Sequence, residues 1–326
     1  MRLGGVWFRV ASSRRVATVV KSHRMTMQDQ AAPEADPLAY LLLTLTALCW
    51  GANAILGRLA VGEVSPMALT MLRWLLALAL LAAVAQAQVR RDWPVLRQHL
   101  PFLVVMGALG FTGFNAVYYV AAHYTTAVNL GIIQGSIPVF VLIGAFAAYR
   151  TAVTPLQIAG VVVTMLGVVL VGTGGDLGRI AALAINWGDF LMIVACVLYA
   201  GYTVALQRRP PVAALSLFMA LAGAALVASL PLVALEAAAG LLQWPTATGW
   251  LIVALTVLFP SFLAQMFFIR GVELIGPGRA GVFINLVPVF ASILAVAILS
   301  ESFAVFQAIA LGLVLGGIWL SELGKR

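Results

Sequence analysis

Polar side chains inside long apolar segments are the residues of this sequence best suited to bind a ligand. Arg73 is the only basic residue well inside such a segment, and Asn53 and Asn115 are amides in similar surroundings. A central arginine costs at least about 2.5–3.5 kcal/mol on insertion scales, so it requires a partner. That partner is the carboxylate of a substrate or, in the structural alternative, backbone carbonyls or the membrane interface.

Further amides and aromatic residues lie at matching places in the two halves of the chain. Amides and phenols inside a membrane are costly unless they meet each other or a hydrated cavity. Taken singly, each is explained by an interhelical hydrogen bond, but their matching positions favour a shared central cavity. The candidate substrate-binding residues are Trp50, Asn53, Arg73, Asn115, Tyr118, Gln134, Tyr199, Tyr202, Gln265 and Asn285.

Two prolines, Pro138 and Pro288, lie near the middle of two apolar segments. Proline leaves a backbone carbonyl without its helical donor, and matched pairs of interrupted helices indicate a transport site. Gly131 and Gly281 lie one to two turns before these prolines, so we assign all four residues to helix breaks and gating. Close helix packing through small residues explains the same pattern, and both readings stay open.

The elements that position these residues are predicted to be transmembrane helices. Of 326 residues, 63% are hydrophobic and 9% are charged, whereas soluble domains carry about 25% charged residues. This excludes a soluble enzyme. Because a span needs about 20 apolar residues, the sequence predicts an all-α protein of ten spans. They cover 38–60, 66–87, 101–122, 126–149, 154–172, 187–207, 212–235, 248–270, 277–299 and 304–322.

The chain repeats itself at a shift of 150 residues. Pro138-Val139-Phe140 aligns with Pro288-Val289-Phe290, and ten of the 40 pairs that begin at residue 131 are identical. Five helices in each half place the second copy upside down, which is the architecture of secondary transporters. The predicted domains are a basic tail (1–37) and two repeats (38–173 and 186–322).

The net charge of +8 reports orientation and not a nucleic-acid partner. Residues 1–24 hold six basic residues and no acid. With the N-terminus inside, sixteen basic residues fall on the cytoplasmic side and only Arg58 and Arg179 on the other. The positive-inside rule therefore predicts that both termini are cytoplasmic. The first 24 residues are a juxtamembrane tail or, as we favour, precede a true start at Met25 or Met27.

Residues that are missing narrow the chemistry further. Cys49 and Cys196 are isolated and no His/Cys cluster has metal-ligand spacing, so we expect no metal and no cofactor. Lys21 and Lys325 are terminal, which excludes a retinal Schiff base. No carboxylate lies at a midplane, and this disfavours a multidrug or cation efflux transporter. A membrane-embedded enzyme and a non-transporting receptor are the weaker alternatives.

The residues also resemble the EamA family of the drug/metabolite transporter superfamily. Leu48-Cys49-Trp50-Gly51-Ala52-Asn53 is similar to its LWGxN opening, and Leu72-Arg73-Trp74 to its second-helix arginine. Ala121–Ala127, followed by Pro138 and Gly167, resembles its signature for helices 3–5, and 271–317 is the second copy. One departure is that Ser300-Glu301 keeps the acid that the family often has after helices 4 and 9, whereas Arg150-Thr151 does not.

The resemblance implies a ten-helix transporter of small metabolites in the inner or plasma membrane. Together with the missing charges, it predicts substrates that are neutral, zwitterionic or weakly anionic, such as amino acids, moved by alternating access and exported. The expected partners are this small-molecule substrate and the lipid bilayer, with no nucleic acid. The sequence leaves open whether the chain is a monomer or a homodimer.

Overall fold

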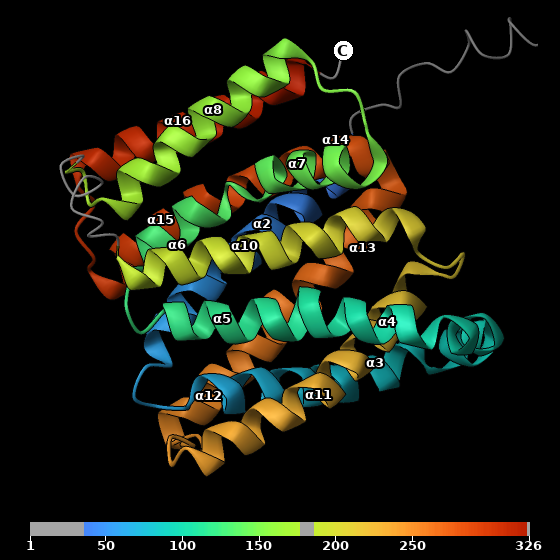
Figure 1. Cartoon of the computed structure of the whole chain (residues 1–326). Helices are drawn as coiled ribbons and strands as arrows, with labels where there is room; N and C mark the ends of the chain where they lie inside the picture. The colour runs from blue at the N-terminus through green and yellow to red at the C-terminus, as the bar shows by residue number, and fades with distance from the viewer. Residues whose placement is uncertain (1–35, 177–185, 325–326) are drawn as a thin grey trace, which may run out of the picture.

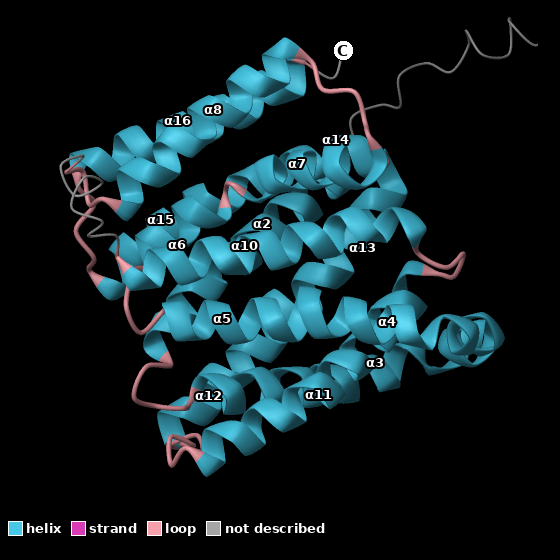
Figure 2. Cartoon of the chain, in the orientation of Figure 1, coloured by secondary structure: helices cyan, strands magenta, loops and turns pink. Residues whose placement is uncertain are grey.

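The computed structural model describes residues 36–176 and 186–324, so the expectations for the tail fall outside it. Within these ranges the chain is helical and has no strand (Figure 2). The first half contains α2 (Pro37–Leu59), α3 (Pro66–Leu96), η1 (Arg97–His99), α4 (Leu100–Gly107), η2 (Ala108–Gly113), α5 (Phe114–Ala121), α6 (Ala127–Gln134), α7 (Ile137–Tyr149) and α8 (Pro155–Gly172). The second half contains α10 (Trp187–Ala205), η3 (Leu206–Arg208), α11 (Ala214–Ala238), α12 (Ala247–Thr256), η4 (Val257–Leu263), α13 (Ala264–Ile275), α14 (Pro277–Val282), η5 (Phe283–Leu286), α15 (Val287–Leu299) and α16 (Val305–Leu323).

The described helices form nine continuous apolar runs, one of which contains two membrane crossings. The run Pro66–Ala121 has 56 residues, which is about 84 Å of helix, whereas the hydrocarbon core is about 30 Å thick. A hydrogen bond between Arg73 on α3 and Asn115 on α5 shows that the two parts of this run lie side by side. The run therefore folds back on itself, and the short segment η1 separates its two parts. With this run counted as two, the described helices suffice for ten crossings, which agrees with the predicted all-α fold class. Figure 1 shows the helices side by side in one bundle.

Many helices begin where a polar capping residue precedes a proline or a free N–H group. Asp36 accepts hydrogen bonds from the N–H groups of Leu38 and Ala39 at the start of α2. Thr154 and Gln157 form a reciprocal capping box at the start of α8, and Asn186 caps α10. These side chains satisfy N–H groups that have no helical partner. The boundaries are thus fixed by local chemistry that the sequence displays.

The two halves pack through small residues. Figure 1 shows α8 beside α16, the last helix of each half, and this is the most extensively packed pair. A Cβ on Gly160 would lie 2.5 Å from the carbonyl oxygen of Gly317, and a Cβ on Gly167 would lie 2.8 Å from that of Ala310. Because lipid gives no hydrophobic drive for helix association, close backbone approach of this kind stabilises the pair.

Backbone irregularities recur at the 150-residue shift. A π-helical segment interrupts the third span at Ala108–Gly113 and the eighth at Val257–Leu263. Arg150 and Ser300, each at the C-cap of a helix, have positive φ angles of 54° and 53°. A left-handed residue at this position is most easily glycine, so an arginine and a serine share the same unusual geometry at corresponding places. The two halves therefore share backbone geometry as well as sequence.

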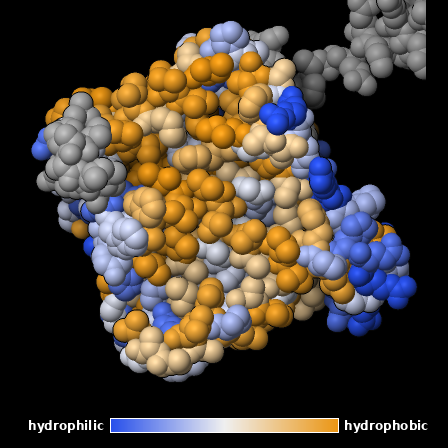
Figure 3. All heavy atoms as spheres, viewed as in Figure 1, coloured by the Kyte–Doolittle hydropathy of each residue, from blue (hydrophilic) through white to orange (hydrophobic). Residues whose placement is uncertain are grey.

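Charged residues divide the bundle into two ends. One end, which we call the basic end, carries eight arginines and four acids: Arg90, Arg91, Arg97, Arg150, Arg208, Arg209, Arg270 and Arg279, with Asp36, Asp92, Glu273 and Glu322. The opposite end, the acidic end, carries Glu63, Asp176, Asp189, Glu236 and Glu301, together with Arg58. In the face viewed in Figure 3, hydrophobic side chains fill the middle and hydrophilic ones gather toward the ends, most densely where α3 turns into α4. This belt is the surface that lipid covers.

Candidate functional site

The buried guanidinium of Arg73 organises a polar cluster between α2, α3 and α5. Its Nη1 donates to Oδ1 of Asn53 at 3.0 Å, to Oδ1 of Asn115 at 2.7 Å and to the hydroxyl oxygen of Tyr119 at 2.6 Å. The Tyr119 hydroxyl in turn donates to Asn53 Oδ1 at 3.1 Å. Arg73, Asn53 and Asn115 are 6%, 5% and 3% exposed. The structure thus brings together three of the predicted site residues.

The positive charge of this cluster has no acidic partner. Among the described residues the only ion pair within 4.0 Å joins Arg270 and Glu273 at the basic end. The three hydrogen-bond acceptors of Arg73 are neutral oxygens, and all of them bind Nη1. Its Nε is buried without a hydrogen-bond partner. A desolvated charge is stable only when polar groups or an opposite charge compensate it. The Nε of Arg73 is therefore a donor that the described residues leave unsatisfied.

Aromatic rings line one side of the Arg73 cluster. Trp74 lies 5.2 Å from the Arg73 guanidinium, and its ring stacks on Phe111 with centroids 4.7 Å apart. The Phe111 ring lies 5.3 Å from Tyr202, and the Tyr202 ring lies 5.4 Å from Tyr199. The predicted Tyr199 and Tyr202 therefore belong to the same group of contacts as Arg73.

Tyr118 lies at the opposite edge of this aromatic group. Its ring is fully buried between Phe114 and Tyr119, with centroids 5.6 and 5.8 Å away. The hydroxyl of Tyr118 lies near Asn53 but makes no hydrogen bond of good geometry, whereas the hydroxyl of its neighbour Tyr119 makes two. Sequence spacing placed Tyr118 with Asn115 on one face, but Tyr119, four residues after Asn115, makes the polar contact.

The other predicted residues lie apart from Arg73. Trp50 packs on Phe268 of α13 with ring centroids 5.3 Å apart, and thus joins α2 to the second repeat. Gln134, Gln265 and Asn285 are half-buried, and no hydrogen bond links them to Arg73 in the part of the chain that is described. Their role in substrate binding stays a prediction.

Both predicted helix breaks coincide with real interruptions. The fourth span is divided into α6 and α7, and Pro138 lies in the first turn of α7. The ninth span passes from α14 through the 3-10 segment η5 into α15, where Pro288 lies in the first turn. A Cβ on Gly131 would overlap the Cβ of Ala291, whereas a Cβ on Gly281 meets nothing within 4 Å. The gating role of these four residues remains a prediction, and only Gly131 is a close-packing position.

A second polar cluster, which the sequence analysis did not assemble, closes the acidic end. Asp189 on α10 is 1% exposed and accepts from Thr125 Oγ1 at 2.5 Å and from Asn129 Nδ2 at 3.2 Å. Gln307 Nε2 on α16 donates to Asn129 Oδ1 at 2.8 Å. Glu301 accepts from the N–H groups at the start of α6. These bonds tie α6 of the first repeat to α10 and α16 of the second.

Two signals in the sequence point to the residues that were missed. Gln307 recurs at the repeat shift as Gln157, and both accept from the backbone of their own helix start. Thr125 and Asn129 lie four residues apart at the start of the fourth span. Nothing local identifies Asp189 as their acceptor, because the contact spans 64 residues from Thr125.

Comparisons with known proteins agree with this architecture. The chain is 29% identical over 285 residues to the uncharacterized transporter YyaM of Bacillus subtilis, covering 86% of this chain and 92% of that protein. It is 24% identical over 283 residues to the uncharacterized inner membrane transporter YedA of Escherichia coli K12, covering 85% and 88%. A solved crystal structure superposes with a TM-score of 0.58 at 23% identity, covering 88% of this chain and 99% of that one, and so shares the fold. The EamA-like transporter family matches twice, over residues 37–173 and 186–323, and the chain belongs to this family.

Proposed function

We propose that this membrane transporter moves small metabolites that carry a carboxylate, such as amino acids and related zwitterionic or weakly anionic compounds, and that it exports them by alternating access. The observation that carries the substrate class is the buried Arg73 with its unpartnered Nε and no acidic neighbour among the described residues. Arginine binds carboxylates through two parallel N–H donors. The Nε edge is the part of the fork that the neutral oxygens leave available.

The orientation is part of the same proposal. The positive-inside rule places the arginine-rich basic end in the cytoplasm and, with it, both termini of an inner or plasma membrane protein. The acidic end is tied by the Asp189 cluster, whereas a cavity of about 590 Å³ opens at the basic end. We infer that substrate enters from the cytoplasm, because on this orientation the pocket lies on the side from which an exporter loads its substrate.

Flux into proteoliposomes tests the substrate class. The purified protein is assayed with the protein amino acids and, for each one that is transported, with its C-terminal amide, which lacks the negative charge. The wild type should transport at least one amino acid and discriminate against its amide. Arg73→Gln should lose this discrimination with a rise in KM, while Arg73→Lys should keep part of it because the charge remains.

Arg58→Gln is the matched control, because Arg58 is an arginine of the acidic end that bonds only to the backbone oxygen of Ala122 in the described contacts. It should discriminate as the wild type does. An Arg73→Gln protein that inserts and still prefers the acid over the amide would show that Arg73 has a structural role alone. Absence of flux for every amino acid would remove the proposed substrate class altogether.

A further inference from the structure

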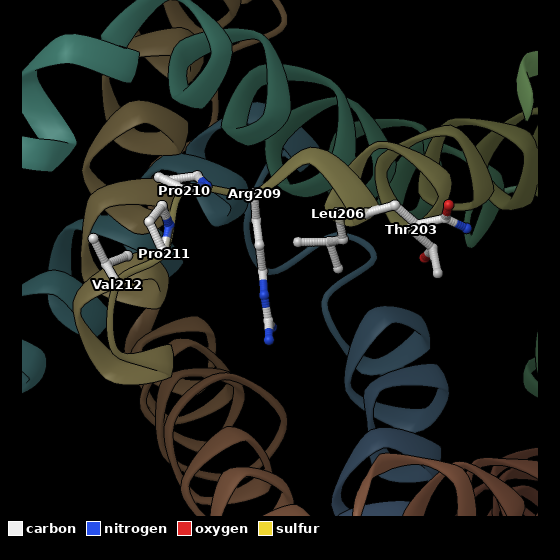
Figure 4. A pocket seen from close by; sticks show the side chains of 7 residues that line it. Thr203, Leu206, Arg209, Pro210, Pro211 and Val212 are labelled. Carbon is white, nitrogen blue, oxygen red and sulfur yellow. The ribbon is translucent and has the colours of Figure 1, made fainter. Parts of the chain in front are cut away.

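A second anion site is indicated at the basic end of α10. The cavity there is lined by Thr203, Leu206, Gln207, Arg209, Pro210, Pro211 and Val212, where η3 ends and the chain turns toward α11. Figure 4 shows the Arg209 side chain extending from the backbone into this hollow, between Leu206 on one side and Pro211 and Val212 on the other. The guanidinium is therefore presented to whatever occupies the cavity.

No charge in the lining neutralises Arg209. Its companions in the cavity are apolar except for the neutral Thr203 and Gln207, and no carboxylate lies within 4.0 Å of it in the described part of the chain. The preceding residue, Arg208, is in different surroundings, because its guanidinium lies over the ring of Tyr149 at 5.2 Å. An arginine in a hollow without a carboxylate concentrates ions of opposite sign.

Aromatic contacts connect this cavity to the Arg73 cluster. Thr203 of the cavity wall follows Tyr202, whose ring lies 5.3 Å from Phe111. Phe111 stacks on Trp74, and Trp74 lies 5.2 Å from the Arg73 guanidinium. The ring contacts thus run from the Arg73 guanidinium on α3 through Trp74 and Phe111 to Tyr202 on α10, one residue before the cavity wall.

We propose that Arg209 is the first binding site for the substrate carboxylate at the cytoplasmic mouth, from which the substrate passes to Arg73. This inference rests on the proposed function for the substrate and its direction. Binding at the mouth raises the local concentration of the anion and leaves the later steps unchanged. Replacing Arg209 should therefore act on KM, in a manner that salt screens, and not on kcat.

The first test is independent of any transported substrate. Cys49 and Cys196 are buried, so Gln207→Cys introduces an accessible thiol in the cavity wall. The rates at which anionic MTSES and cationic MTSET modify this thiol are compared in three proteins. These carry Gln207→Cys alone, with Arg209→Gln, or with the control change Arg208→Gln. The MTSES/MTSET ratio should fall about tenfold at low salt with Arg209→Gln and stay at the starting value with Arg208→Gln. An equal ratio in all three backgrounds overturns the proposal.

The second test is transport of the amino acid with the highest wild-type flux. Arg209→Gln should raise KM about tenfold at low salt, with unchanged kcat and a smaller effect at 0.5 M salt, and Arg208→Gln should match the wild type. A changed labelling ratio with an unchanged KM would also overturn the proposal. If wild-type flux is absent, the proposed function fails, and the labelling ratio still reports whether Arg209 forms an anion site.

A phospholipid phosphate is the other source of an anionic group at this position. Both tests are therefore run in vesicles of phosphatidylcholine alone and of phosphatidylcholine with phosphatidylglycerol. Effects of Arg209→Gln that are present without anionic lipid support the substrate site. Effects that appear only with phosphatidylglycerol would assign the cavity to a lipid headgroup and overturn the proposal.

Discussion

The adjacent tyrosines of α5 allow a test in which one chemical change has opposite results. Tyr119→Phe removes a buried hydroxyl that bonds to the charged Nη1 of Arg73 at 2.6 Å and to Asn53 at 3.1 Å. Hydrogen bonds to charged groups contribute about 1.5–3 kcal/mol, and we expect a loss of about 2 kcal/mol in the free energy of unfolding. Tyr118→Phe removes a buried hydroxyl that lies near Asn53 but makes no hydrogen bond of good geometry, and its removal should gain about 1 kcal/mol.

The two variants should thus differ by about 3 kcal/mol, a range that equilibrium unfolding in mixed dodecylmaltoside and SDS micelles resolves. Both rings are retained, so the ring contact between Tyr118 and Tyr119 is a shared background. Equal destabilisation by both changes would refute the reasoning, because it would mean that the Tyr118 hydroxyl also has a partner. Impaired transport by Tyr118→Phe at unchanged stability would identify that partner as the substrate and would support the original cavity assignment of Tyr118.

Two further predictions use other parts of the fold. Gly131→Ala should destabilise the protein by about 1–3 kcal/mol, because the new Cβ overlaps Ala291, while its repeat counterpart Gly281→Ala should be neutral or slightly stabilising, since its Cβ meets nothing within 4 Å. Unfolding in the same micelles compares the pair, and equal effects would contradict the packing difference. Burial first, and the charge of Arg58 next, lower the pKa of His123 below its ordinary value. Because the unfolded chain then binds the proton more readily, stability should fall as the pH drops through about 6.5, and His123→Gln should flatten this slope in unfolding curves between pH 8 and 5.5. An unchanged slope would show that His123 does not contribute.

Much of the fold can be predicted from the sequence, because a lipid bilayer allows few backbone structures. A backbone in hydrocarbon must satisfy its own hydrogen bonds, so apolar runs of sufficient length become helices. The prolines at 138 and 288 then mark the interruptions, and Thr154 and Asn186 mark helix starts. The bend within Pro66–Ala121 was also predictable from the arginines that separate its two apolar parts. These are local signals, and each acts within a few residues of the feature that it predicts.

The polar clusters could be predicted less well from the sequence, because they depend on helix rotation and on pairing across the bundle. Periodicity places both Tyr118 and Tyr119 near the face of Asn115, and only the position of Arg73, 46 residues away, selects Tyr119. The π-helical segment Ala108–Gly113 precedes these residues and shifts the register that an ideal helix would have. Nothing in the sequence pairs Asp189 with its donors, since Thr125 and Asn129 lie on elements of the other repeat.

The two repeats differ in their surroundings, and the sequence does not predict this difference. Gly131 and Gly281 are equivalent in sequence, yet the first is enclosed against Ala291 and the second borders open space. The acidic end is held by Asp189, Asn129 and Gln307, while the basic end opens around Arg209. Two copies of one sequence pattern thus occupy different environments in a single structure. The proposed transport by alternating access would require these environments to exchange between the copies, which would open the acidic end and close the basic end.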